Sequence, residues 1–298
     1  MGKQIVVTGA SGYLGAVLCS SLARSGYDVI AFKRRSNDDR VQGVDLTDHS
    51  ATQEAFSAIQ GPYWVVHAAT VPHRTGLVRS NFYGSNVVMT RNVVRACEHR
   101  AAGLILLSSV AVYGELGRPA MISPAAIPKP SSAYAYSKLE SERVVIESSL
   151  PCCWILRVAP AFDRSRTIVL RRRACVLGID GLKLRVIPPP RYSLAHSSTV
   201  VRAVRDALQA PPGRWIQNVA EPFILSQREL LGWFRGPTLT FPAAPVKPVL
   251  ALLQALSWGP AYSLGCLLEK LFLGATYDTT PFEINMNNPR RSPEGGQA

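Results

Sequence analysis

The feature that most constrains the fold of this chain is a glycine-rich turn close to its N-terminus. Residues 8–15 read TGASGYLG; they follow the apolar stretch Gln4–Thr8 and open a helical pattern over Tyr13–Ser25. Glycines at this spacing permit a tight turn and let the backbone approach a pyrophosphate, while the helix N-terminus offers free N–H donors. A strand, such a turn and a helix in this order predict a dinucleotide-binding site. The residues expected to form it are Gly9, Ser11, Gly12, Tyr13, Leu14 and Gly15.

Apolar runs alternate with helical patterns through the first half of the chain. Short runs rich in Val, Ile and Leu predict buried strands, and this alternation is typical of a parallel sheet with helices on both faces. We therefore predict an α/β fold: a Rossmann-type doubly wound parallel sheet in residues 1–158, then a smaller irregular α/β substrate lobe in residues 159–298, with some of its segments returning to the sheet. The predicted strands are Gln4–Thr8, Asp28–Phe32, Trp64–His67, Leu104–Ser108 and Cys153–Val158, and the predicted helices are Tyr13–Ser25, Ala51–Ile59, Asn81–Arg100 and Ser132–Ser148.

Composition excludes a disordered or collagen-like chain. With 47% hydrophobic and 18% charged residues over 298 positions, we expect a folded globular protein. Its six cysteines form no Cys-x-x-Cys pair and have no histidine cluster beside them, so we expect reduced thiols and no metal. The N-terminus leads directly into the first strand without a signal-peptide pattern, and we expect a cytoplasmic location.

The segment Pro248–Leu268 carries no charged residue, and about 20 apolar residues can span a bilayer. Gly259 and Pro260 interrupt the segment, however, and three polar side chains dilute its hydrophobicity. We predict two short buried or amphipathic helices here. A weak peripheral membrane contact is the alternative.

The net charge of +13 is distributed unevenly. Between Ile155 and Ala220, eleven arginines and one lysine stand against three aspartates. This excess predicts an anionic partner, and the alternative is a solvated basic face that keeps the protein soluble. Because no nucleic-acid-binding motif accompanies the basic residues, we expect a small anionic substrate and no nucleic acid.

The end of the second predicted strand indicates which nicotinamide cofactor binds. An acidic residue roughly 20 positions beyond the glycines accepts from the 2′-hydroxyl of NAD in dinucleotide-binding folds. This chain instead has Lys33, Arg34 and Arg35 there, and no acidic residue follows the strand before Asp38. Because cations favour a 2′-phosphate, we expect NADP (NADPH), with NAD as the alternative.

Tyr134 and Lys138 are candidates for proton transfer. They stand four residues apart in the helical pattern Ser132–Ser148, so both side chains lie on one helix face. A phenol with an ordinary pKa of about 10 is a poor acid or base at neutral pH, and a neighbouring ammonium favours its ionised form. Such a pair can pass a proton to or from a carbonyl oxygen, although the Tyr-x-x-x-Lys pattern alone also occurs by chance.

Six segments, taken together, carry a resemblance to a known family. They are Thr8–Gly15, Asp45–Asp48, His67–Ala69, Asn86-Val87 before Thr90, Ser108–Gly114, and Tyr134 with Lys138. In order and spacing they resemble the extended short-chain dehydrogenases/reductases of the NAD-dependent epimerase/dehydratase family. The resemblance implies a Rossmann fold, a nicotinamide cofactor, and a homodimer formed through the helices expected at 81–100 and 132–148.

The resemblance also implies a role for individual residues. Ser109 would hydrogen-bond the substrate oxygen, Tyr134 would exchange its proton, and Lys138 would serve the phenol and the nicotinamide ribose together. Tyr136 would point elsewhere on the helix. The other expected cofactor contacts are Asp45 at the adenine, Ala68 and Ala69 at the pyrophosphate and ribose, and Leu46 and Asn86, whereas His67 and Ser108 would be structural.

The second half of the chain is similar to the family more thinly. Many sugar-nucleotide epimerases have an asparagine where this chain has Pro160, and a common aspartate is here Thr199. These departures argue against an ordinary UDP-galactose-type epimerase. Arg157, Arg191 and the run Arg171–Arg173 are the candidates for binding a substrate diphosphate. Arg191 is the first choice, because it precedes the segment that resembles the family's substrate-binding stretch and because consecutive arginines on a helix point in three directions.

The favoured hypothesis is an NADPH-dependent reductase of a nucleotide-linked 4-keto-6-deoxy sugar, as used in surface-polysaccharide biosynthesis. One alternative keeps the sugar nucleotide but makes the enzyme an NAD-dependent epimerase. Another is a reductase of a non-sugar carbonyl compound. The last is a non-catalytic nucleotide-binding protein.

Overall fold

A computed structural model of the chain describes residues 3–34, 42–71, 83–114, 120–176, 181–244, 246–255 and 259–284. Its centre is an eight-stranded sheet in the order β3-β2-β1-β4-β5-β6-β11-β14, in which only β14 runs antiparallel to its neighbour. The glycine-rich turn follows β1, and the chain leaves the sheet in opposite directions after β1 and β4, so a crevice for a dinucleotide lies between them. The strands are β1 (Gln4–Thr8), β2 (Asp28–Lys33), β3 (Gln42–Gly43), β4 (Tyr63–His67), β5 (Ala101–Ser109), β6 (Cys153–Val158), β11 (Arg214–Val219) and β14 (Phe282–Glu283).

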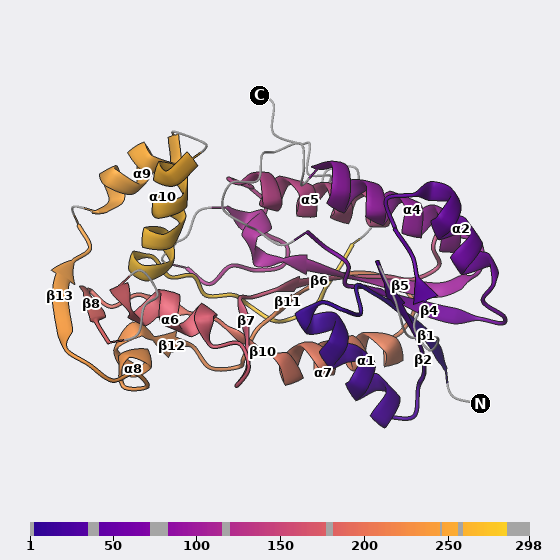
Figure 1. The fold of residues 1–298 in the computed structure, drawn as a ribbon, viewed down its shortest axis with the longest axis horizontal. Helices are drawn as coiled ribbons and strands as arrows, with labels where there is room; N and C mark the ends of the chain where they lie inside the picture. The colour runs from indigo at the N-terminus through magenta and orange to yellow at the C-terminus, as the bar shows by residue number, and fades with distance from the viewer. Residues whose placement is uncertain are drawn as a thin grey trace.

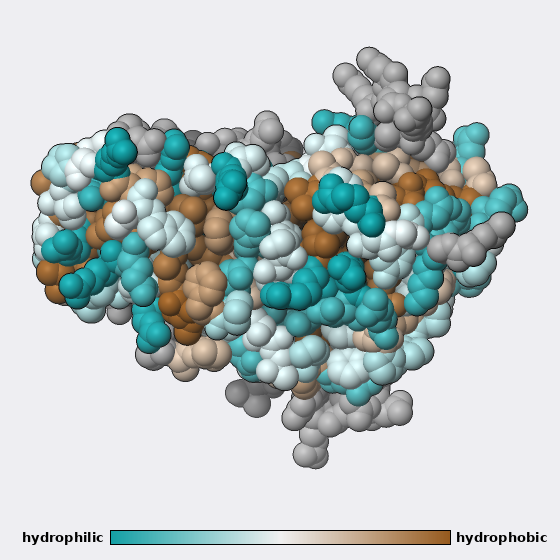
Figure 2. Space-filling model, turned by 90° about the horizontal axis from the view of Figure 1, so that it is seen from below, coloured by the Kyte–Doolittle hydropathy of each residue, from teal (hydrophilic) through white to brown (hydrophobic). Residues whose placement is uncertain are grey.

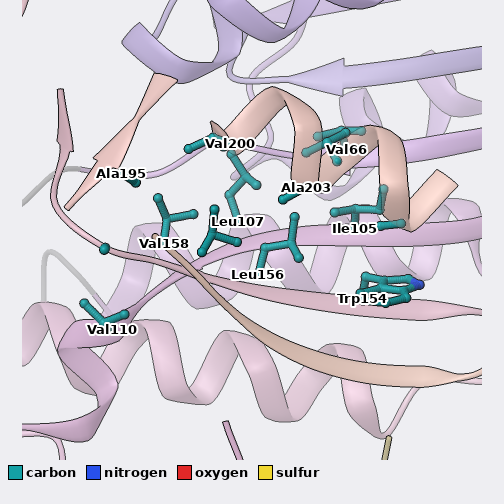
Figure 3. Close-up of a cluster of buried hydrophobic side chains, with 14 of the residues drawn as sticks. Val66, Ile105, Leu107, Val110, Trp154, Leu156, Val158, Ala195, Val200 and Ala203 are labelled. Atoms are coloured by element: carbon teal, nitrogen blue, oxygen red, sulfur yellow. The ribbon is translucent and has the colours of Figure 1, made fainter. Parts of the chain in front are cut away.

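Helices cover both faces of the sheet, which confirms the predicted doubly wound fold (Figure 1). The central strands carry apolar residues on both faces, as parallel strands buried on both sides do. On one face, Val66, Ile105 and Leu156 pack with Val200 and Ala203 of the covering helix (Figure 3). One face carries α1 (Tyr13–Arg24) and α7 (Ser197–Gln209), and the other carries α2 (His49–Ser57), α4 (Val88–Cys97) and α5 (Ala133–Ile146).

Two of the predicted helices, α2 and α5, begin where a side chain caps them. The carboxylate of Asp48 accepts from the backbone N–H of Ala51 at 3.1 Å, so α2 begins two residues earlier than predicted. The hydroxyl of Ser132 accepts from the N–H of Ala135 at 3.2 Å and starts α5. The predicted helix 81–100 is not uniform in its described part, because Tyr83–Val87 forms a π-helical turn ahead of α4.

The C-terminal lobe is built around short elements and two small hydrophobic clusters. Three segments after residue 158 pack on or join the central sheet, namely α7, β11 and β14. The other elements of the lobe are β7 (Ala161–Phe162), α6 (Ile168–Ala174), β8 (Lys183–Ile187), β9 (Arg191–Tyr192), β10 (Ala195–His196), β12 (Leu225–Ser226), α8 (Gln227–Leu231), β13 (Thr238–Pro242), α9 (Val246–Ala255) and α10 (Gly259–Phe272).

The uncharged segment 248–268 falls in α9 and α10, as two short helices. Leu250 and Phe272 pack against Val186 in one of the small clusters, whereas Leu252 is exposed. No helix within the described residues is long and apolar enough to cross a membrane. At the end of the molecule formed by this lobe, hydrophobic areas alternate with hydrophilic ones on the face seen in Figure 2.

A buried ion pair joins α5 to the sheet. Arg157 of β6 donates to both carboxylate oxygens of Glu142, with its Nη2 lying 2.7 Å from Oε2. Ser108 donates to the same carboxylate at 2.5 Å, and Arg157 also donates to the hydroxyl of Tyr113 at 2.9 Å. Tyr113 in turn donates to Asn218 of β11 at 2.7 Å. The network therefore fixes α5 relative to the ends of three strands.

Removing one charge of this pair should strongly destabilise the fold. Glu142→Gln leaves Arg157 buried beside a neutral amide, so we expect the free energy of unfolding to fall by about 3–5 kcal/mol. Glu140→Gln is the matched control, since its pair with Arg143 lies on the same helix but is partly exposed, and it should change stability by less than about 1 kcal/mol. Urea denaturation measures both, and equal losses would contradict a structural role for the buried pair.

Candidate active site

The glycine-rich turn forms a backbone cradle with no room for side chains. Gly9 has φ +69°, and a Cβ there would lie 2.6 Å from the backbone of Ala69, in the loop after β4. A Cβ on Gly15 would overlap the carbonyl of Gly9. Gly12 is the N-cap of α1, and no side chain caps that helix. Its first N–H groups therefore remain available for an anion, and the cradle fits a dinucleotide pyrophosphate.

The expected ribose and adenine contacts lie at the ends of β2 and β3. Lys33 is half-buried and Arg34 is exposed, while Arg35 lies outside the described residues. Asp45 is exposed, and its carboxylate accepts from the side chain and backbone of Thr47 at 2.7 and 3.0 Å. These hydrogen bonds, with a smaller effect of Arg34, lower the pKa of Asp45. The side chain of Leu46 is buried in the core.

A chain of hydrogen bonds behind the cradle connects β1, β4 and the π-helical turn. The hydroxyl of Thr8 and the Nδ1 of His67 lie 2.7 Å apart, and the Nε2 of His67 lies 3.1 Å from the hydroxyl of Thr90. Thr90 donates to the carbonyl of Asn86, whose side chain accepts from the N–H of Val71 at 2.7 Å. Burial lowers the pKa of His67 to about 3. His67 is therefore a neutral structural residue.

Ser109 and Tyr134 come together at the carboxyl end of β5. Burial raises the pKa of Tyr134, and a side-chain hydrogen bond with Ser109 opposes that shift. Lys138 lies one turn further along α5 and donates from Nζ to the carbonyl of Leu107 at 2.6 Å. Burial lowers the pKa of Lys138 to about 8, with Glu142 acting in the opposite direction. Tyr136 is 41% exposed, so its side chain does not share this environment.

Ser109 and Tyr134 line a pocket of about 380 Å³ between the sheet and the C-terminal lobe. Leu14 of α1 also lines this pocket, so the pocket adjoins the glycine-rich turn. The lobe contributes Arg173 of α6 and Tyr192 of β9. The pocket is therefore built from both halves of the chain.

The arginines expected to bind a substrate diphosphate lie in different environments. Arg157 is 3% exposed, and Glu142, Tyr113 and the carbonyl of Pro124 occupy its guanidinium, which corrects the expectation that it binds substrate. Arg191 is exposed on β9 and lies outside the pocket wall, near enough to Glu229 to contribute to lowering the pKa of that carboxyl.

The run Arg171–Arg173 does point in different directions. Arg172 is exposed, Arg171 is half-buried, and Arg173 is buried in the pocket wall. Sequence reasoning ranked this run below Arg191 because nothing in a row of three arginines shows which one faces inward. The only sequence signal was weak: Leu170, which is buried, lies three residues before Arg173 and so on the same helix face, whereas the apolar Ile168 is exposed.

No metal site is apparent in the described parts of the chain, where no group of three His, Cys, Asp or Glu residues could hold an ion. Cys19, Cys97, Cys152 and Cys153 are thiols. The site described above therefore consists of hydroxyls, a phenol, an amine and a guanidinium.

Comparison with known proteins agrees with this geometry. Residues 5–150 match the NAD dependent epimerase/dehydratase family. This part of the chain belongs to that family. A structure of dTDP-4-dehydrorhamnose reductase from Bacillus anthracis in complex with NADP superposes with a TM-score of 0.68 over 94% of this chain and 92% of that one, at 17% identity. At this identity the likeness shows the shared fold alone.

Two curated relatives are similar to part of the chain. Human sterol-4-alpha-carboxylate 3-dehydrogenase, decarboxylating, is 30% identical over 154 residues, which cover 50% of this chain and 41% of the relative. The 2-alkyl-3-oxoalkanoate reductase of Stenotrophomonas maltophilia is 32% identical over 112 residues, covering 36% and 33%. The chain thus spans less than half the length of these relatives, and half or more of the chain lies outside each match.

The neutral state of His67 makes the fold sensitive to acid. The unfolded chain takes up a proton near pH 6.5 but the folded chain only near about pH 3, so stability is fully present above the higher value and is lost as pH falls between them. Between about pH 7 and about pH 4.5, protonation of this group should lower the free energy of unfolding by about 2–3 kcal/mol. Urea denaturation of the wild type and of His67→Gln at both pH values tests this, since the variant should lack that part of the loss. An equal pH dependence of the two proteins would show that His67 does not carry it.

Proposed function

We propose that the chain is an NADPH-dependent oxidoreductase that reduces a carbonyl compound in the pocket lined by Ser109 and Tyr134. The observation that carries the proposal is the hydrogen-bonded pair of Ser109 and Tyr134, in a pocket that Leu14 connects to the uncapped end of α1. A proton donor, a hydrogen-bond donor for an oxygen and a pyrophosphate cradle thus lie around one space.

The residues of the pocket have separate roles in this reaction. The bound cofactor would supply a hydride to the carbonyl carbon. Tyr134 would give its phenolic proton to the carbonyl oxygen, and Ser109 would orient that oxygen. Because burial raises the pKa of Tyr134, the phenol is protonated at neutral pH and suits the role of an acid. In the role that the family resemblance implies, Lys138 would hold the nicotinamide ribose and serve the phenol.

The first substrate class is a nucleotide-linked 4-keto-6-deoxy sugar. The excess of arginine between Ile155 and Ala220 supports it, since a sugar nucleotide carries a diphosphate. The similarity in fold to a dTDP-4-dehydrorhamnose reductase along nearly the whole chain agrees with it.

A second substrate class, a non-sugar carbonyl compound with an apolar body, has support of its own. Leu14, Val110, Val158 and Leu273 line the pocket, and such walls suit a hydrocarbon better than a sugar. The two relatives named above act, by their names, on a sterol carboxylate and on an alkyl oxoalkanoate.

Loss of the Tyr134 hydroxyl tests the reaction. In Tyr134→Phe we expect kcat for carbonyl reduction to fall by roughly 10²–10⁴-fold, because the proton is transferred only in the transition state. The affinity for NADPH should barely change. Tyr136→Phe, two positions away and exposed, is the control and should keep its activity. Full turnover of Tyr134→Phe would disprove the assignment of the acid.

The basic residues at the end of β2 test the cofactor. Replacing Lys33 and Arg34 by Gln should weaken NADPH by about 10–100-fold and NADH by less than about twofold, since only NADPH has a 2′-phosphate to lose contact with. Fluorescence titration of both cofactors measures this. Arg24→Gln at the far end of α1 is the control. Equal losses for the two cofactors would argue against NADP.

A further inference from the structure

Arg173 is a buried cation in the wall of the pocket. It is 6% exposed, yet it lines the same space as Ser109 and Tyr134. Its Nη1 donates to the carbonyl of Val169 at 2.8 Å, whereas its Nε is buried without a hydrogen-bond partner. Its guanidinium carbon lies 5.3 Å from the centre of the Tyr192 ring. A guanidinium has five N–H donors, so Arg173 keeps donor capacity that the described residues do not use.

No carboxylate in the described part of the chain forms an ion pair with Arg173, whereas the equally buried Arg157 is paired with Glu142. Burial lowers the pKa of Arg173, and the other groups that act on it are Tyr192, Tyr277 and Arg172. A guanidinium nevertheless stays protonated in proteins, and an unpaired buried charge is costly. Within the described residues, Arg173 is therefore a buried cation without an anion beside it.

The surroundings of Arg173 suit a small anion. Glu269 and Lys270 of α10 also line the pocket as adjacent opposite charges, and most of the remaining wall is apolar. A volume of about 380 Å³ lies near the lower end of the range for ligand sites. One guanidinium matches one carboxylate in charge and in its two-pronged geometry, whereas a diphosphate brings more charge than one arginine neutralises.

We propose that Arg173 binds a carboxylate of the substrate inside this pocket, so that the substrate is an oxo acid with an apolar body. The inference rests on the proposed carbonyl reduction for the reaction, and it narrows the substrate to the second of the two classes. The carboxylate would also place the carbonyl carbon reproducibly beside Ser109 and Tyr134, because both ends of one small molecule would be held.

Binding of defined probes to the full chain tests the proposal. Calorimetry in the presence of NADP⁺, which prevents turnover, would compare 3-oxooctanoate, 2-heptanone as the same ketone without a carboxylate, and UDP-glucose as a diphosphate. In Arg173→Gln we expect 3-oxooctanoate to bind about 10–100-fold more weakly, with the other two probes unchanged. Arg172→Gln, an exposed neighbour on the same helix, is the matched control and should bind all three as the wild type does.

Stability separates a binding role from a structural one. Arg173→Met replaces an unpaired buried charge by an apolar side chain, so its urea midpoint should stay equal or rise. Because calorimetry with NADP⁺ measures binding without turnover, a loss of affinity in Arg173→Gln does not depend on whether the proposed reaction takes place. Any one of four results would overturn the proposal. Three concern binding: unchanged affinity of Arg173→Gln for 3-oxooctanoate, a loss confined to UDP-glucose, or wild-type binding of 2-heptanone as tight as that of 3-oxooctanoate. The fourth is a lower urea midpoint of Arg173→Met.

Discussion

The position of the candidate active site depends on the buried ion pair between Arg157 and Glu142. Glu142 lies one helical turn after Lys138 on α5, and Arg157 lies on β6 beside the strand that ends in Ser109. Because two charges without water are stable only while they face each other, the pair fixes the helix that carries Tyr134 to the strand ends. Neither residue lines the pocket. Two residues outside the pocket thus fix the positions of Ser109 and Tyr134 in its wall.

The two halves of the chain contribute different chemistry to one pocket. The family domain supplies Ser109, Tyr134 and the backbone cradle at Gly9, to which the proposed reaction assigns the oxygen contact, the proton donor and the cofactor site. The C-terminal lobe supplies Arg173 and Tyr192, which face the space where a substrate would lie. The family match covers residues 5–150 and therefore does not reach Arg173 or Tyr192.

Predictions from the sequence were accurate where they depended on residues close together in the chain. The strands around the glycine-rich turn were placed to within a few residues, because apolar runs and helix caps are local signals. The expectation that Arg157 binds substrate was wrong, because Arg157 forms an ion pair with Glu142. The two residues lie on different elements, so their spacing in the sequence does not predict the pair. Arg191 was preferred to the run Arg171–Arg173 as the arginine that binds a substrate diphosphate. The sequence could not show that Arg173 lines the pocket and Arg191 does not, because this depends on how α6 and β9 pack.

The sequence by itself determined the doubly wound sheet, the dinucleotide cradle and the presence of a serine, a tyrosine and a lysine in the order typical of the family. These follow from residues near one another in the chain, where turn geometry and helical spacing act directly. Only the tertiary structure decided that Arg157 is neutralised inside the core and that Arg173 lies in the pocket wall, where no described carboxylate pairs with it. Burial and ion pairing depend on contacts between segments far apart in the sequence, and those contacts exist only once the lobe has packed against the sheet.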